Sequence, residues 1–227
     1  MQIRPEVKPF IVFSITSGLI LSCCMMLADA GWQQAIFLSI AITAVACSYF
    51  LYFFRDPDRH PPDDQLAIVA AADGVVAAIA ELHEDEYLKT DCYRISIFLS
   101  LFNVHVNRSP IAGKSTFLGY FPGKRFFTFQ EKASEFNQHN KILIEGPHTR
   151  CLVYQIVGPV CRRVVYWPDH NSAVDVSIGE RIGMMKFGSR LDIYFPKADI
   201  NILSQIGDKV SAGESVIASL VPNEDLD

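Results

Sequence analysis

The sequence predicts a mainly β (β-rich α+β) domain preceded by an N-terminal transmembrane helical hairpin. Two long uncharged apolar runs lie within residues 1–54, and short apolar segments separated by turn residues fill the rest of the chain. The charge distribution agrees, because residues 1–54 carry only Arg4, Glu6, Lys8 and Asp29 as charged residues. We therefore divide the chain into a membrane-anchoring hairpin, residues 1–54, and a β-rich domain, residues 55–227.

The two apolar runs cover residues 10–28 and 35–54, which are 19 and 20 uncharged residues. A helix of that length crosses a hydrocarbon core of roughly 30 Å. A cleaved signal peptide is the main alternative for the first run, and it leaves the second run unexplained. Buried core helices are the other alternative. Two such runs in succession favour the membrane hairpin.

The flanking charges predict the orientation of this hairpin. Arg4 and Lys8 precede the first run, Arg55 and Arg59 follow the second, and the connection at residues 29–34 carries no Lys or Arg. By the positive-inside rule, both ends of the hairpin and the following domain lie on the cytoplasmic face of the cell membrane.

After a proline-rich exit at residues 55–64, the pattern indicates short strands in a barrel-like or sandwich-like domain. Residues 66–80 read as a strand, a turn at Asp73-Gly74 and a second strand. Residues 198–205 are expected to form a short helix, and the glycine turn in 207–216 suggests a hairpin, as does the ending of 174–183. Further strands are expected at 94–101, 104–106, 142–144, 151–157 and 164–167.

Composition disfavours several classes of function. The net charge is −5, which gives no electrostatic case for a nucleic-acid partner. The six cysteines form no CxxC pair, so neither a zinc site nor a disulfide framework is indicated. The chain also lacks a P-loop, a GxGxxG run and an HExxH pair, so no metal or nucleotide site is expected.

The pair Gly188-Ser189 is the most informative local feature. About one Gly-Ser pair is expected by chance from 13 Gly and 17 Ser in 227 residues, and most such pairs are ordinary turns. Here the pair lies between two apolar stretches, just before the strand-like residues 191–195. That context suggests a serine that attacks its own backbone, since glycine leaves the attacked carbonyl open and tolerates a strained conformation.

Four motifs occur in a fixed order along nearly the whole chain. They are Phe53-Phe54-Arg55-Asp56-Pro57, Ala72-Asp73-Gly74, Asn103-Val104-His105-Val106-Asn107-Arg108-Ser109-Pro110 and Phe187-Gly188-Ser189-Arg190. Together they resemble the phosphatidylserine decarboxylase family, in its short, membrane-anchored form. The resemblance implies that the β-rich domain is catalytic.

In that family the serine attacks the preceding carbonyl, and the chain splits after an N-to-O acyl shift. Mapped here, the resemblance implies a β chain of residues 1–188 and an α chain of residues 189–227, held as a heterodimer; any higher assembly is left open. Ser189 would become a covalent pyruvoyl cofactor, which forms a Schiff base with the amine of phosphatidylserine. Loss of CO₂ would then give phosphatidylethanolamine.

Asp73 and His105 are the candidates for activating Ser189, because histidine moves protons near neutral pH and an acid orients its ring. Without the resemblance, Asp73 reads as a turn residue and His105 as a buried strand histidine. Many relatives carry a second histidine where this chain has Arg108. The processing base is therefore left open between His105 and contributions from His139, His148 or His170.

Basic residues after the second motif could meet anionic lipid headgroups, or could simply form a solvated loop face. These residues are Lys114, Lys124, Arg125 and Lys132.

Two other functions remain as alternatives. One is a pyruvoyl decarboxylase of a soluble amino acid, which the two membrane spans disfavour. The other is a non-enzymatic, membrane-tethered β module, which would leave the chain uncut.

Overall fold

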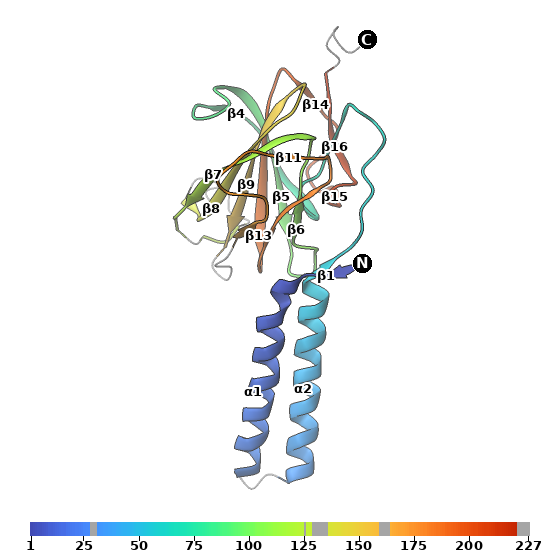
Figure 1. Ribbon diagram of the computed structural model, residues 1–227, viewed down its shortest axis with the longest axis vertical. Coiled ribbons are helices and arrows are strands. Elements are labelled where there is room, and N and C mark those ends of the chain that lie inside the picture. Colours follow the sequence, from blue (N-terminus) through green and yellow to red (C-terminus); the bar gives the residue numbers. More distant parts are fainter. Residues whose placement is uncertain (28–30, 125, 129–135, 159–163, 222–227) are drawn as a thin grey trace. The chain divides into compact units, whose positions relative to one another are not determined.

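The computed structural model describes residues 1–27, 31–124, 126–128, 136–158 and 164–221. It comprises two compact units, Met1–Asp58 and Arg59–Asp227 (Figure 1). Asp29, Arg125 and Lys132, which entered the sequence analysis, lie outside the described residues.

The first unit is a helical hairpin. A 3₁₀ turn η1 (Pro5–Val7) leads into α1 (Lys8–Leu27), and α2 (Trp32–Phe53) runs back beside it (Figure 1). The short strands β1 (Gln2–Ile3) and β2 (Arg55–Asp56) pair at its open end. Both helices are long and apolar enough to cross a membrane, and they expose large apolar side chains such as Phe13 and Phe37. The two predicted apolar helices are therefore confirmed, with α2 beginning inside the expected connection.

The second unit is built on one eight-stranded antiparallel sheet, which includes almost all of its long strands. Its strand order is β11-β7-β8-β9-β13-β5-β4-β15. These strands are β4 (Gly74–Glu84), β5 (Thr90–Leu99), β7 (Gly113–Phe121), β8 (His139–Glu145), β9 (Arg150–Val157), β11 (Val174–Val176), β13 (Ser189–Pro196) and β15 (Lys209–Val210).

Two three-stranded sheets complete this unit, with strand orders β10-β12-β6 and β14-β16-β3. Their strands are β3 (Ala67–Val69), β6 (Val106–Arg108), β10 (Val164–Tyr166), β12 (Arg181–Met185), β14 (Ile200–Ile202) and β16 (Val216–Leu220). The predicted mainly β domain behind a helical hairpin is thus confirmed.

Strand β13 lies at the centre of the large sheet, and all eight of its residues are buried. Leu191, Ile193 and Phe195 belong to the main apolar core. Tyr194 belongs to a smaller cluster with residues of β5 and β9. Because side chains alternate along a strand, β13 has both of its faces covered. Its first residue, Ser189, pairs with Leu99 of β5 and with Val157 of β9.

The β10-β12-β6 sheet packs over the main-core face of β9. Gln155 of β9 donates a hydrogen bond to Asn107 of β6, with a distance of 2.8 Å. A Cβ on Gly183 of β12 would lie 2.8 Å from the same Gln155 nitrogen. Glycine at this position therefore lets the Gln155 side chain reach β6.

Three local predictions are wrong, and pairing with distant segments explains them. Residues 198–205 contain β14 instead of a helix, because Ile200 and Ile202 pair with β16. The 207–216 turn joins β15 and β16, which belong to different sheets, so it does not close a hairpin. The same holds for β11 and β12 in residues 174–183. The sequence analysis also missed β7, whose strand pattern is interrupted by Gly119.

Candidate active site

The backbone before Ser189 is strained. Phe187 and Gly188 have φ values of 61° and 68°, so two successive residues adopt the left-handed conformation. Glycine adopts it freely, whereas a bulky residue such as Phe187 pays about 1–3 kcal/mol. A Cβ on Gly188 would meet nothing within 4 Å, so this position requires glycine for its backbone angle and not for space.

The Ser189 hydroxyl is buried without a hydrogen bond. Its residue has 0% exposure, and within the described part of the chain its Oγ has no partner. A buried polar group left in this state costs about 1–3 kcal/mol, and such groups are rare in folded proteins. A hydroxyl that contributes nothing to the fold, beside a strained peptide bond, is suited to react with that bond.

The carbonyl that Ser189 would attack lies beside Gly158, directly after β9. A Cβ on Gly158 would be 3.2 Å from the carbonyl oxygen of Gly188 and 3.2 Å from Cγ2 of Thr128. Gly158 has no left-handed backbone angle. Its lack of a side chain therefore serves to keep space open next to the Gly188 carbonyl.

The pairing of β6 with β12 brings the backbone of His105 next to β12, the strand that ends shortly before this bond. The His105 carbonyl accepts a hydrogen bond of 3.1 Å from the amide of Met185, four residues before Ser189. The ring is fully buried, and its Nδ1 lies 2.9 Å from the carbonyl oxygen of Asn103. Since a carbonyl only accepts, Nδ1 carries the hydrogen, and the neutral ring keeps its lone pair on Nε2. That tautomer is the one a general base needs.

Asp73 lies at the same end of the large sheet. Its Oδ1 accepts a hydrogen bond of 2.8 Å from the amide of Ala212, and its Oδ2 accepts one of 2.9 Å from Arg59. Val75 of β4 pairs with Phe98, and Ser189 pairs with the next residue of β5. Asp73 is therefore two strands from Ser189, or about 10 Å.

The other candidate histidines lie elsewhere. His139 pairs with Ile156, which pairs with Arg190, so its side chain occupies the opposite face of the sheet from Ser189. His148 lies in the β8–β9 turn, at the end of β9 far from Val157. His170 contacts the ring of Phe117 on β7, three strands from β13.

Arg108, which stands where many relatives have a second histidine, has a structural setting. Its Nη1 donates a hydrogen bond of 2.9 Å to the carbonyl of Gly179. Its amide donates one of 2.9 Å to Ala71, two residues before Asp73. A Cβ on Gly213 would lie 2.8 Å from its Cδ. Arg108 thereby ties the His105 segment to the Asp73 segment.

Sequence reasoning missed Asn107, Gln155 and Gly158 as residues of this region. Asn107 and Gln155 are fully buried polar side chains inside strands, and a polar residue at an inward strand position was the available signal. Nothing in the sequence marked Gly158, because its neighbour Gly188 is 30 positions away. Among the described residues, no group of three or more His, Cys, Asp or Glu could hold a metal ion.

Comparison with known proteins identifies the family. A model of the phosphatidylserine decarboxylase family matches residues 47–218. The chain is 39% identical over 210 residues to the phosphatidylserine decarboxylase proenzyme of Syntrophus aciditrophicus, which covers 92% of this chain and 94% of that protein. It is 42% identical over 172 residues to the proenzyme of Carboxydothermus hydrogenoformans, covering 76% and 80% respectively. The chain therefore belongs to the phosphatidylserine decarboxylase family.

Proposed function

We propose that this protein cuts itself at Gly188–Ser189 and then decarboxylates phosphatidylserine to phosphatidylethanolamine. Family membership supports the overall reaction. The observation that carries the self-cleavage is the buried, unpartnered Ser189 hydroxyl directly after two left-handed residues.

In the cleavage step, Nε2 of His105 takes the proton from Ser189 Oγ, and Oγ attacks the Gly188 carbonyl carbon. The Oγ–C ester bond forms as the C–N peptide bond breaks, and the released amine takes a proton. Loss of the α-proton of residue 189 then expels the Gly188 carboxylate. The resulting dehydroalanine is hydrolysed, which releases ammonia and leaves a pyruvoyl group at residue 189.

The fold accommodates the two chains that this cleavage would produce. The α chain, residues 189–227, would contain β13, β14, β15 and β16, and β13 lies between β5 and β9 of the β chain. Hydrogen bonds along both edges of β13 would hold the heterodimer together without a covalent link.

The surroundings of residue 189 suit a reactive carbonyl. Leu99 and Val157 flank it on the neighbouring strands and are almost completely buried, so the position is shielded from water. A pyruvoyl group supplies a carbonyl that condenses with an amine and withdraws the electrons released with CO₂. His105 would return a proton to the substrate's α-carbon.

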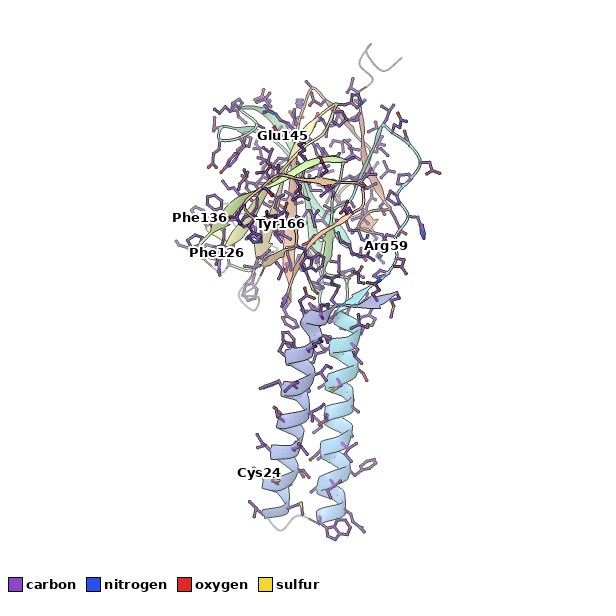
Figure 2. All side chains as sticks on the ribbon, in the orientation of Figure 1. Cys24, Arg59, Phe126, Phe136, Glu145 and Tyr166 are labelled. Carbon is purple, nitrogen blue, oxygen red and sulfur yellow. The ribbon has the colours of Figure 1, made fainter. Side chains whose placement is uncertain are left out.

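Apolar side chains at this end of the sheet support a substrate that stays in a membrane. Leu101 and Phe102 follow β5 just beyond the partner of Ser189, and they are 44% and 67% exposed. Phe127 and Phe136, in the β7–β8 connection, are 56% and 49% exposed. Figure 2 shows Phe126 and Phe136 at this end of β8, with Glu145 at the other end.

These residues form a plausible contact surface for the lipid interface. Lys124 adds a positive charge there, since its ammonium lies 5.7 Å from the rings of Phe126 and Phe136. Together with the apolar hairpin, this supports anchoring at the cell membrane. The flanking charges support a catalytic domain on the cytoplasmic side.

The test is the size and terminus of the purified protein's chains. We expect fragments of roughly 21 and 4 kDa, in proportion to 188 and 39 of the 227 residues that together weigh 25.4 kDa. Mass spectrometry should show a pyruvoyl terminus on the smaller one. The enzyme should release CO₂ from phosphatidylserine and not from free serine, which separates the lipid from the soluble substrate.

Ser189→Ala should leave one uncut, inactive chain, because no hydroxyl remains to attack Gly188. Ser204→Ala is the matched control, since Ser204 also has a buried hydroxyl without a partner among the described residues. That variant should cut and turn over normally. Decarboxylation by an uncut Ser189→Ala protein would overturn the proposal.

A further inference from the structure

A chain of buried amides crosses the sheet near Ser189. Asn140 Nδ2 donates a hydrogen bond of 3.1 Å to Gln155 Oε1, and Gln155 Nε2 donates one of 2.8 Å to Asn107 Oδ1. All three residues are at most 3% exposed. In each amide the oxygen accepts and the nitrogen donates. This chain of hydrogen bonds, the amide relay, therefore ends at Asn107 Nδ2, which is its terminal donor.

That terminal donor is unsatisfied. Within the described ranges, Asn107 Nδ2 is buried and has no hydrogen-bond partner. A buried N–H group in this state is costly. Its orientation is nevertheless fixed by Gln155, so the donor is pre-organised for an acceptor that the protein chain itself does not supply.

The register places the Gln155 side chain on the face of Ser189, at a position about 7 Å along β9 from Val157, the partner of Ser189. Gln155 pairs with Leu191, and Val157 pairs with Ser189. Because Gln155 and Val157 are two residues apart on β9, their side chains lie on the same face of the sheet. Asn107 pairs with Gly183 of β12, and His105, just before β6, accepts a hydrogen bond from Met185 of the same strand.

The donor is distant from the carbonyl attacked during self-cleavage. The Gly188 oxygen lies beside Gly158, which is three residues beyond Gln155. At about 3.3 Å per residue, this separation is about 10 Å. Measured along β9, Gln155 is thus nearer to the level of residue 189 than to that of the Gly188 carbonyl.

We propose that Asn107 Nδ2 binds the carboxylate of phosphatidylserine beside residue 189, an assignment that rests on the proposed function. The carboxylate is the acceptor that distinguishes substrate from product. A neutral amide can orient it, whereas an ion pair with a cation would stabilise a charge that the reaction must remove from that position.

The test uses Asn107→Asp, which keeps an oxygen to accept from Gln155 and replaces the donor. The cut enzyme is reduced with borohydride, so that residue 189 carries an alcohol and no turnover occurs. Short-chain phosphatidylserine and phosphatidylethanolamine are then titrated by calorimetry. We expect the variant to bind phosphatidylserine about 10- to 100-fold more weakly than wild type, with unchanged affinity for phosphatidylethanolamine.

Gln155→Glu provides a second variant without a charge at position 107. Its carboxylate would accept from both Asn140 and Asn107, so the Asn107 donor would turn away from residue 189. We expect the same loss of preference for phosphatidylserine, whereas Ser204→Ala should retain wild-type affinities for both lipids.

Both relay variants should still split into two chains. An unchanged phosphatidylserine affinity in either variant, or a failure of Asn107→Asp to cut, would overturn the assignment to Asn107. A wild-type protein that stays uncut would instead refute the proposed function, so the two failures are distinguishable.

Discussion

The polar side chains of β13 are all buried but differ in how they are satisfied. On one face, Arg190 Nε donates a hydrogen bond of 2.7 Å to Asp192 Oδ1, and Arg190 Nη2 donates one of 3.0 Å to Ser96. On the other face, the Ser189 hydroxyl and the Asn107 amide each leave a buried polar atom without a partner among the described residues.

This difference separates structural from reactive polar groups on a single strand. The charges of Arg190 and Asp192 compensate each other and hold the strand in place, whereas the Ser189 hydroxyl of the same strand has no hydrogen-bond partner among the described residues. Neighbouring residues should therefore respond to mutation in opposite ways: changes on the Arg190 face should alter stability, and changes on the Ser189 face should alter chemistry.

The largest effect on stability is expected for Asp192→Ala. Removing one partner of a buried ion pair leaves an uncompensated charge, which costs about 3–5 kcal/mol. The free energy of unfolding should be measured by urea titration in detergent, with Ser189→Ala as the background so that all chains are uncut. Ser189→Ala alone removes an unsatisfied hydroxyl and should lose no stability. An unfolding free energy of the double variant equal to that of Ser189→Ala would contradict a stabilising role for the Arg190–Asp192 pair.

The next effect concerns the two buried histidines of the opposite faces. His105→Ala should slow chain cleavage or turnover at least about 10²-fold, the usual scale for a lost acid–base group. His139→Phe, on the Arg190 face, should cut at the wild-type rate. Both rates can be followed by electrophoresis after synthesis in a cell-free system. Near-normal kinetics in His105→Ala would remove this residue from the mechanism.

Asp73→Ala should also slow cleavage or turnover at least about 10²-fold if the acid orients the base. Arg59→Met is the comparison variant, because it removes the 2.9 Å hydrogen bond to Asp73 and leaves the Asp73 carboxylate in place. The same kinetic assay measures both variants. A wild-type rate in Asp73→Ala would leave His105 as the sole activating residue.

The sequence was sufficient to predict the helical hairpin and the mainly β domain, and it singled out Ser189, whose reactivity stays a prediction. Uninterrupted apolar runs predict the hairpin helices. The Gly188-Ser189 pair, between apolar stretches and just before a strand-like segment, suggests a serine that attacks its own backbone. The sequence did not separate His105 from His139, because both are strand-associated histidines. The pairing of β8, β9 and β13 separates them, because it puts the His139 side chain on the opposite face of the sheet from Ser189. That pairing joins segments that are distant in the sequence.

Tertiary pairing also explains what sequence reasoning could not supply elsewhere. Residues 200–202 form an edge strand only because β16 is available beside them. Asn107 and Gln155 are 48 positions apart, so their hydrogen bond leaves no local pattern. Gly158 likewise has a meaning only once β9 and β13 are adjacent.

A smaller effect on cleavage is expected for Gly158→Ala. The added methyl group would lie 3.2 Å from the Gly188 carbonyl oxygen, which moves as its carbon becomes tetrahedral. We expect cleavage about 10-fold slower, on the scale of a displaced reacting group, with normal turnover by the fraction that cuts. Gly31→Ala is the control, since its methyl group would meet nothing closer than 3.8 Å. Unchanged cleavage would show that this space is not needed.

The smallest effect is a pH dependence of stability that arises on the Arg190 face. Burial lowers the pKa of His139 below its ordinary value of 6.5, and the positive charge of Lys141 acts in the same direction. The unfolded chain therefore takes up this proton at a higher pH than the folded chain. The stability contributed by neutral His139 is fully present above about pH 6.5 and is lost as the pH falls towards the lowered pKa.

Thermal unfolding between pH 7.5 and 5 should accordingly show a falling midpoint, with each unit of pKa difference worth about 1.4 kcal/mol. His139→Phe keeps an aromatic ring between Phe121 and Tyr154 and removes the titration, so it should flatten this dependence. The Ser189→Ala background again keeps the chain uncut. If His139→Phe retained the wild-type slope, the pH dependence would have to come from another group, and the histidine of the Arg190 face would contribute to packing alone.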